Sequence, residues 1–358
     1  MPVDLTPSLQ PLLDRLVEEG TELGIQVAVY HRGQLRIDAV AGLADRANRV
    51  PVTHDTLFPV FSVSKGIAST VIHRLVDRGV LDYDRPIAEV WPEFGAHGKD
   101  TITLRDALAH ATGIPQMPEE TTLEDLADWD LMCAQIADLT PLWTPSTRIE
   151  YHPITFGWMI GEVARRATGK PFEQLVDEEV RQPLGVEDLY IGSNDFAGKP
   201  IAVLEDDPEV FGEPTIPPPG TPETVPARFG SLAALMNRPD AQAACVPATS
   251  GLMSARATAR HYQALLDHTL LSAERLHIAA ERQTPRNPVG EYLTDRGIGY
   301  RLGESPTGSL TIGHGGHGGT NTFADPENQI ALAVHKNRLN RGDTTGQIIE
   351  EIYRLIGS

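Results

Sequence analysis

The sequence predicts an α+β fold in which both ends of the chain build one antiparallel sheet around an inserted, mostly helical lobe. β-prone runs lie near both termini, helical patterns dominate from about 100 to 190, and no internal repeat or long linker divides the chain. We therefore expect a single domain, 1–358, with an α/β lobe from about 1–80 plus 290–358 and a helical lobe from 81–289.

The N-terminal part supplies the first elements of this plan. Apolar residues at helical spacing predict an amphipathic helix over 8–20. Two β-prone runs, 24–31 and 34–41, flank an Arg-Gly turn and predict a hairpin. A helix is then expected over 62–78, because an apolar periodic pattern ends at Gly79.

The remaining elements follow from helical periods, caps and turn residues. The helix beginning near Thr103 carries Asp106 three residues later, the pattern of a capping box. Seven prolines in 204–228 indicate a long surface loop and a candidate lid over a pocket. Further helices are expected at 103–110, 154–168, 255–271 and 345–356, and further strands at 310–313, 320–324 and 330–335.

Composition excludes several classes of protein. Lys and Arg number 30 against 49 Asp and Glu, a net charge of −19, which disfavours nucleic acid and anionic membranes as partners. Hydrophobic residues make up 41% of the 358, enough for a real core. Cys133 and Cys245 are too few for a disulfide framework or a cysteine zinc site, so buried side chains are expected. The first residues do not resemble a secretory signal, and we expect a cytoplasmic protein.

The strongest catalytic candidate is the pair Ser62 and Lys65. A Ser-x-x-Lys pattern at the start of a helix places both side chains on one face, where the amine can reach the hydroxyl. An ordinary helix cap followed by a solvated lysine is the alternative. Only one of the chain's five lysines has a serine three residues earlier, and it opens an apolar helix. This favours a lysine close to the core.

Two further segments carry candidate chemistry. Tyr151 precedes the helix at 154–168 and can present its phenol to a neighbouring site, although a boundary tyrosine packed in the core is the alternative. Residues 312–320 contain His314 and His317 among dense glycines, which permit close approach of a substrate or another backbone. A metal site is disfavoured, because no third ligand is near in sequence. No nucleotide-binding motif or Gly-x-Ser-x-Gly elbow is present, and no cofactor is expected.

These segments, in this order, resemble the serine β-lactamase and penicillin-binding-protein family, and most closely its class C β-lactamase-like hydrolases, which include family VIII carboxylesterases and related acyltransferases. The resemblance extends from about 22 to 356 and implies a β-lactamase/transpeptidase-like fold. It also implies that Ser62 is the acylated nucleophile, Lys65 its base partner and Tyr151 the second member of a proton relay. The backbone N–H groups of Ser62 and His317 would form the oxyanion hole. Substrate contacts are expected from His314, Gly315, Gly316 and His152.

Two departures from the family's motifs bear on the substrate. Pro153 stands where the family has Asn, and His314 stands where it has a Lys that meets a substrate carboxylate. Both weaken the case for β-lactams or peptides, and a neutral ester is favoured. We therefore expect a carboxylesterase-like serine hydrolase with a small-molecule ester or acyl substrate. A biosynthetic acyltransferase is the alternative, a β-lactamase or D-Ala-D-Ala carboxypeptidase is third, and an inactive binding protein is the rival from another class.

Three tryptophans and the two relay side chains leave alternatives open. Trp129, Trp143 and Trp158 are candidates for the substrate pocket, with plain core packing as the alternative. Whether Lys65 or Tyr151 accepts the first proton stays open, because the two groups should titrate as a coupled pair. The oligomeric state has no signature in the sequence.

Overall fold

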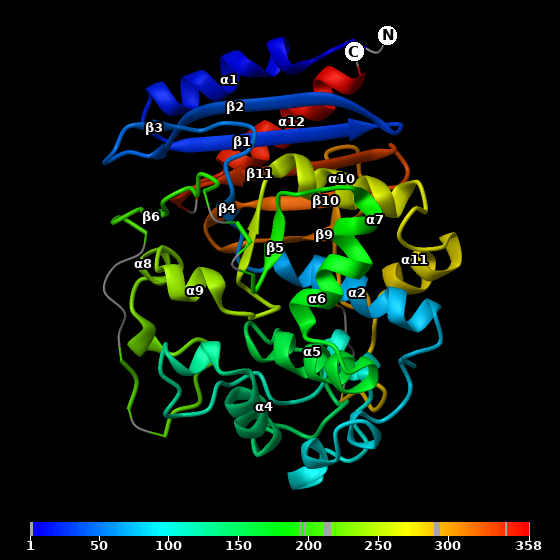
Figure 1. The fold of residues 1–358 in the computed structure, drawn as a ribbon. Helices are drawn as coiled ribbons and strands as arrows, with labels where there is room; N and C mark the ends of the chain where they lie inside the picture. Colours follow the sequence, from blue (N-terminus) through cyan, green and yellow to red (C-terminus); the bar gives the residue numbers. More distant parts are fainter. Residues whose placement is uncertain are drawn as a thin grey trace.

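A seven-stranded antiparallel sheet forms one layer of the molecule (Figure 1). The computed structural model describes residues 3–193, 195–196, 198–210, 216–218, 220–289, 294–340 and 342–357. The strand order is β3-β2-β1-β11-β10-β9-β8. The bounds are Gly24–His31 (β1), Gln34–Asp45 (β2), Val50–Pro51 (β3), Arg301–Glu304 (β8), Leu310–Gly315 (β9), Asn321–Asp325 (β10) and Ile330–Lys336 (β11). The predicted hairpin and the predicted sheet from both ends of the chain are therefore confirmed.

The two terminal helices cover the outer face of this sheet, and both termini lie there (Figure 1). Helix α1 (Thr6–Glu18) buries Leu9 and Leu13, and α12 (Thr344–Gly357) buries Ile352, in one cluster with β1, β2, β10 and β11. Helix α10 (Ala255–Leu266) packs on the opposite face through a seam of alanines. The helix predicted over 255–271 ends earlier, at Leu266.

Below the sheet lies the mostly helical part of the molecule (Figure 1). Its helices are α2 (Ser64–Asp77), α3 (Leu104–Leu108), α4 (Trp129–Ala137), α5 (Thr155–Thr168), α6 (Phe172–Val176), α7 (Gln182–Leu184), α8 (Leu232–Met236), α9 (Pro239–Ala243) and α11 (Ala273–Ala280). Thr103 and Asp106 form the predicted capping box at α3. Gly169, in a left-handed conformation, ends α5 where the sequence places its stop.

Short strands also occur where the sequence pattern gives no sign of them. One small sheet has the order β4-β7-β5, formed by Phe58–Pro59, Gly251–Met253 and Leu189–Ile191, and another pairs β12 (Arg338–Leu339) with β6 (Glu205–Asp206). Runs of two or three residues are too short to show a period. The first of these sheets matters for function, because β4 ends two residues before Phe61 and fixes the approach to Ser62.

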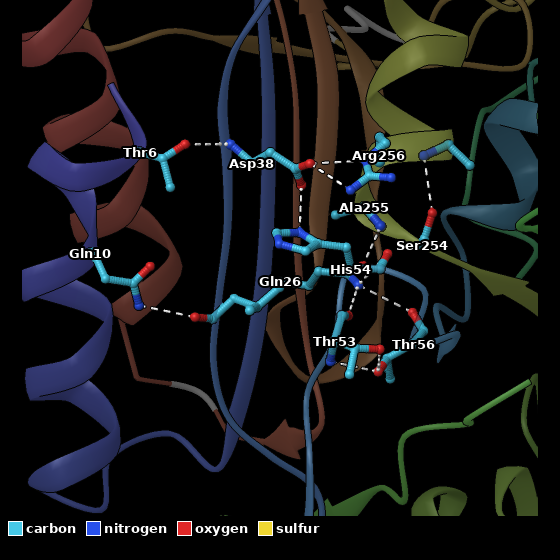
Figure 2. A network of polar contacts seen from close by, with 12 residues as sticks. Thr6, Gln10, Gln26, Asp38, Thr53, His54, Thr56, Ser254, Ala255 and Arg256 are labelled. Atoms are coloured by element: carbon cyan, nitrogen blue, oxygen red, sulfur yellow. Dashed lines mark hydrogen bonds and ion pairs between the residues drawn. The ribbon is translucent and has the colours of Figure 1, made fainter. Parts of the chain in front are cut away.

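A polar network fastens the segment leading to Ser62 onto the sheet (Figure 2). The buried amide of Gln26 on β1 donates to the carbonyls of Thr53 (2.7 Å) and His54 (3.1 Å) and accepts from the backbone N–H of Ala255. Asp38 on β2 binds Arg256 of α10 at 2.7 Å and contacts His54 at 3.0 Å. The segment before β4 and the start of α10 are thus held by the same two strands.

Two further expectations concern membranes and cysteines. Within the described residues, no helix is long and apolar enough to cross a membrane. Both cysteines are free, with Cys133 buried as expected and Cys245 only partly buried.

Candidate active site

Ser62 occupies a strained turn at the start of α2. The preceding residue, Phe61, has φ 48°, a left-handed conformation that is uncommon for a large side chain. The backbone N–H of Lys65 donates to the carbonyl of Ser62 at 3.1 Å, so the turn runs directly into the helix. The Ser-x-x-Lys pattern therefore lies on one helical turn, as predicted.

Lys65 is completely buried beside Ser62. Its Nζ lies 3.1 Å from Ser62 Oγ, 2.7 Å from the carbonyl oxygen of Pro153 and 3.0 Å from that of Ala248. Within the described residues no carboxylate is paired with it. Burial, with a smaller contribution from the charge of Arg296, holds the pKa of Lys65 well below 10.5. This shift favours the uncharged amine, which is the form that can act as a base.

Tyr151 approaches the same oxygen from the segment before α5. Its hydroxyl donates to Ser62 Oγ at 2.7 Å, and its ring centroid lies 5.0 Å from Nζ of Lys65. His110, which has a left-handed backbone (φ 62°), packs its ring 5.0 Å from that of Tyr151. Burial raises the pKa of Tyr151 even though the hydrogen bond to Ser62 and nearby Arg296 oppose the shift. The side chain is therefore a phenol at neutral pH.

The glycine-rich segment forms the end of β9 and the wall opposite Tyr151. A side chain at Gly316 would come within 2.4 Å of the carbonyl oxygen of Val60, so glycine is required there for close approach to the Ser62 segment. His314 lies 6.0 Å from the Tyr151 ring, and burial lowers its pKa far below 6.5, which leaves a neutral imidazole. The third motif thus carries no fixed charge at this position.

A cavity of 660 Å³ opens directly onto Ser62 and Tyr151. Its volume is in the range of small-molecule sites. One wall is apolar and comes from the segment before α4 and from the region of α8 and α9. The main apolar side chains of this wall are Leu123, Leu126, Phe229, Leu232, Leu235 and Met236.

Another part of the lining carries two arginines that the sequence motifs do not indicate. Arg296 and Arg301 line the cavity together with His314 and His317. No motif of the sequence marks these arginines. Tertiary structure brings them to the cavity, because β8 and the residues before it lie beside β9. These two arginines supply positive charge at the cavity, although His314 replaces the family's lysine, and the carboxylates of Glu124 and Asp240 belong to the same lining.

Of the predicted substrate contacts, His152 is the one that does not line the cavity. His152 is fully buried, contacts Thr112 Oγ1 at 2.8 Å and the carbonyl oxygen of Glu150 at 2.6 Å, and does not line the cavity. The expected substrate contact of His152 is therefore wrong: burial of the 151–154 segment turns its ring toward the core. Gly315, Gly316, His314 and His317 do line the cavity.

The three tryptophans and the segment 204–228, the candidate lid, are the other sequence-based candidates for the pocket. None of the tryptophans lines the cavity, and Trp158 is completely buried in the core, so the plain-core alternative holds for it. Residues 211–215 and 219 of the segment 204–228 lie outside the described residues. Of the part that is described, Val225 lines the cavity.

In the described part of the chain, no group of three or more His, Cys, Asp or Glu side chains is arranged to hold a metal ion. At the centre of the site, the Ser62 hydroxyl is contacted by the amine of Lys65 and the phenol of Tyr151. Such a set activates a serine for attack on a carbonyl carbon.

Comparisons with known proteins identify the family. A family model described as Beta-lactamase matches residues 11–351. Esterase/beta-lactamase LipL of Mycobacterium tuberculosis is 35% identical over 344 residues, which span 88% of this chain and 77% of that protein. Two solved structures each align over 99% of this chain and 98% of their own: a penicillin-binding protein homologue from Caulobacter crescentus (30% identity, TM-score 0.82) and a family VIII carboxylesterase (27% identity, TM-score 0.84). The predicted α+β, β-lactamase/transpeptidase-like fold is thereby confirmed, and the chain belongs to the β-lactamase family as a serine hydrolase.

Proposed function

We propose that this protein hydrolyses carboxylic esters through an acyl-enzyme on Ser62. The observation that carries the proposal is the pair of contacts to Ser62 Oγ, from Lys65 Nζ at 3.1 Å and from the Tyr151 hydroxyl at 2.7 Å, at the floor of a cavity. The similarity to esterase/beta-lactamase LipL and to a family VIII carboxylesterase supports this substrate class.

The hydrogen bonds around Lys65 favour it as the base in acylation. A neutral amine has two N–H donors and one lone pair. The carbonyls of Pro153 and Ala248 accept the two donors, which leaves the lone pair toward Ser62 Oγ. The Ser62 hydroxyl then gives its proton to Lys65 as Oγ bonds to the ester carbonyl carbon.

Tyr151 completes the proton path. It is a phenol within hydrogen-bond distance of Ser62 Oγ, so it can donate its proton to the leaving alcohol while the Lys65 ammonium replaces that proton. Water then attacks the acyl-enzyme, and the same pair moves protons in reverse. The backbone N–H groups of Ser62 and His317 are proposed to hold the carbonyl oxygen as its charge develops.

The cavity supports an ester with a sizeable apolar group. Leu126, Phe229 and Leu232 belong to the apolar part of the lining, and burial of each additional CH₂ against these side chains contributes about 0.8 kcal/mol. We therefore expect kcat/KM to increase from acetate to hexanoate esters. A Phe229→Ser variant should reduce this increase more than it reduces acetate hydrolysis.

Acyl transfer to an alcohol or amine is the second candidate, because the apolar wall disfavours water at the acyl-enzyme. It uses the same Ser62 intermediate, and a product assay with a competing alcohol separates the two activities. β-Lactam hydrolysis is third, since Pro153 and His314 replace the family's Asn and Lys. The expected cytoplasmic location, the small-molecule partner and the division into lobes stay predictions.

The decisive experiment measures p-nitrophenyl butyrate hydrolysis and the intact mass of the trapped acyl-enzyme. Ser62→Ala should remove the mass increase and lower kcat/KM by at least about 10³-fold. Ser69→Ala, a matched loss of a buried α2 hydroxyl that donates to the carbonyl of Gly299 at 2.9 Å, should retain both. Unchanged hydrolysis by Ser62→Ala would end the proposal.

A further inference from the structure

Arg296 is a permanent cation next to the two relay side chains. Its side chain is 15% exposed and lines the cavity. Its guanidinium carbon lies 4.8 Å from the centroid of the Tyr151 ring, and Lys65 Nζ lies 5.0 Å from the same centroid. The guanidinium carbon of Arg296 and the Nζ of Lys65 are therefore separated by no more than the sum of these two distances. Burial lowers the pKa of Arg296 from 12.5, but guanidinium stays charged at neutral pH.

Few other charges act on Lys65. The groups around it are the phenol of Tyr151, the ring of Phe156 and three imidazoles, those of His110, His152 and His314. Burial lowers the pKa of each imidazole far below 6.5, to about 3 for His152, so none carries a charge near neutral pH.

Two further charged groups stand beside Arg296. Asp295 lies 3.2 Å from Arg296 Nε and 2.9 Å from Arg301 Nε, and its side chain is 44% exposed. It offsets part of the Arg296 charge from the solvent side. Arg301, at 58% exposure, is more strongly screened by water.

We propose that Arg296 is a positioning residue that disfavours the ammonium form of Lys65, so that the amine keeps its lone pair toward Ser62 at neutral pH. The inference rests on the proposed function and deepens it. Where the family has a lysine in its third motif, this chain has the neutral His314, and Arg296 supplies a cation from a different strand region. Repulsion between like charges across a buried site lowers the affinity of the amine for a proton.

The same charge assists the second half of acylation. After the Ser62 O–H bond breaks and the Oγ–carbon bond forms, the proton resides on Lys65 as an ammonium. Arg296 destabilises that ammonium and favours passage of a proton through Tyr151 to the leaving oxygen, as the carbon–oxygen bond to the alcohol breaks. A base whose pKa lies near the working pH suits both steps.

The test follows the rate of Ser62 labelling by a fluorophosphonate between about pH 5 and 9, which needs no knowledge of the natural substrate. Arg296→Gln should move the acidic midpoint of the labelling rate upward by about one pH unit, whereas Arg296→Lys should restore it to near the wild-type value. Arg301→Gln is the matched control: it removes the same charge from the same wall at a more exposed position, and should move the midpoint less.

Asp295→Asn should move the acidic midpoint of the labelling rate in the opposite direction. It removes the carboxylate that offsets Arg296, so the midpoint should move downward, and this variant gives a result even if Arg296→Gln does not fold. An unchanged midpoint in Arg296→Gln, or an equal shift in Arg296→Lys, would overturn the inference, because a merely structural role changes the rate and leaves the midpoint in place. Failure of the wild-type protein to label would instead end the proposed function.

Discussion

Lys65 and Lys336 are both buried, and the groups around their amines differ. Lys336 closes β11 and is 1% exposed. It forms an ion pair with the buried Glu22 and donates to Asn340 Oδ1 at 2.8 Å and Thr344 Oγ1 at 3.1 Å. Lys65 is equally buried, but its acceptors are backbone carbonyls and the Ser62 hydroxyl.

The difference is the counter-ion. Burial lowers the pKa of both lysines, and the charge of Glu22 opposes that shift at Lys336, whereas Arg296 reinforces it at Lys65. A paired ammonium joins the N-terminal turn to the start of α12 and has a structural role. The amine of Lys65, which has no carboxylate partner among the described residues and lies beside the Ser62 hydroxyl, has a catalytic role in the proposed function. Burial alone does not distinguish a catalytic lysine, and neither does the absence of an ion pair, because Lys99 is also buried and, in the part of the chain that the structure describes, donates only to the carbonyl of Leu139. What distinguishes Lys65 is the serine hydroxyl beside its amine.

The largest effect should follow from removing the unpaired lysine. Lys65→Met keeps the volume and removes the base, so we expect kcat/KM for p-nitrophenyl butyrate to fall by about 10⁴-fold. Thermal denaturation should show no loss of stability, because no ion pair is broken. Lys65→Arg should be equally inactive, since guanidinium cannot accept the proton. Substantial activity in either variant would place the base elsewhere.

Removal of the paired lysine should have the reverse outcome. Lys336→Met leaves the carboxylate of Glu22 buried without its cation, which costs about 3–5 kcal/mol of unfolding free energy. Denaturant unfolding measures the loss. The folded fraction should keep the esterase rate of the parent, and a stable but inactive Lys336→Met protein would contradict the assignment of a structural role.

A second substitution, at Glu22, tests whether the loss of stability in Lys336→Met comes from the unpaired charge. Glu22→Gln combined with Lys336→Met removes both charges and leaves an amide oxygen for Asn340 and Thr344. We expect about 2 kcal/mol of the lost stability to return, because the cost of an uncompensated charge disappears. If the double variant is no more stable than Lys336→Met, the loss arises from packing and not from charge.

The smallest effect concerns pH and stability. The pKa of Lys65 is lowered in the folded protein and returns to 10.5 on unfolding, so between those values the unfolded chain binds a proton that the folded chain lacks. Wild-type stability then increases with pH across that window, while Lys65→Met lacks this contribution. The variant should melt a few degrees higher at about pH 6, with the difference shrinking toward pH 10.5. A pH-independent difference would show that Lys65 titrates normally when folded.

Much of the fold follows from local sequence patterns. The hairpin around Gly33, the capping box at Thr103 and Asp106 and the stop of α5 at Gly169 each depend on residues close together in sequence. These features are predictable because caps, turns and periodicity act over one or two helical turns. Strands of two or three residues, such as β4, could not be predicted from the sequence, because only pairing with a distant segment defines them.

The candidate site divides in the same way. The sequence by itself determined that Ser62 and Lys65 share a helical turn, that Tyr151 precedes a helix, and that glycine is needed near His314, because each is a matter of spacing or residue type. Only the tertiary structure decided that Tyr151 reaches Ser62, that His152 faces the core, and that Arg296 meets the relay. The physical reason is that charge and burial at a site are sums over segments distant in the chain, and no local pattern encodes that sum.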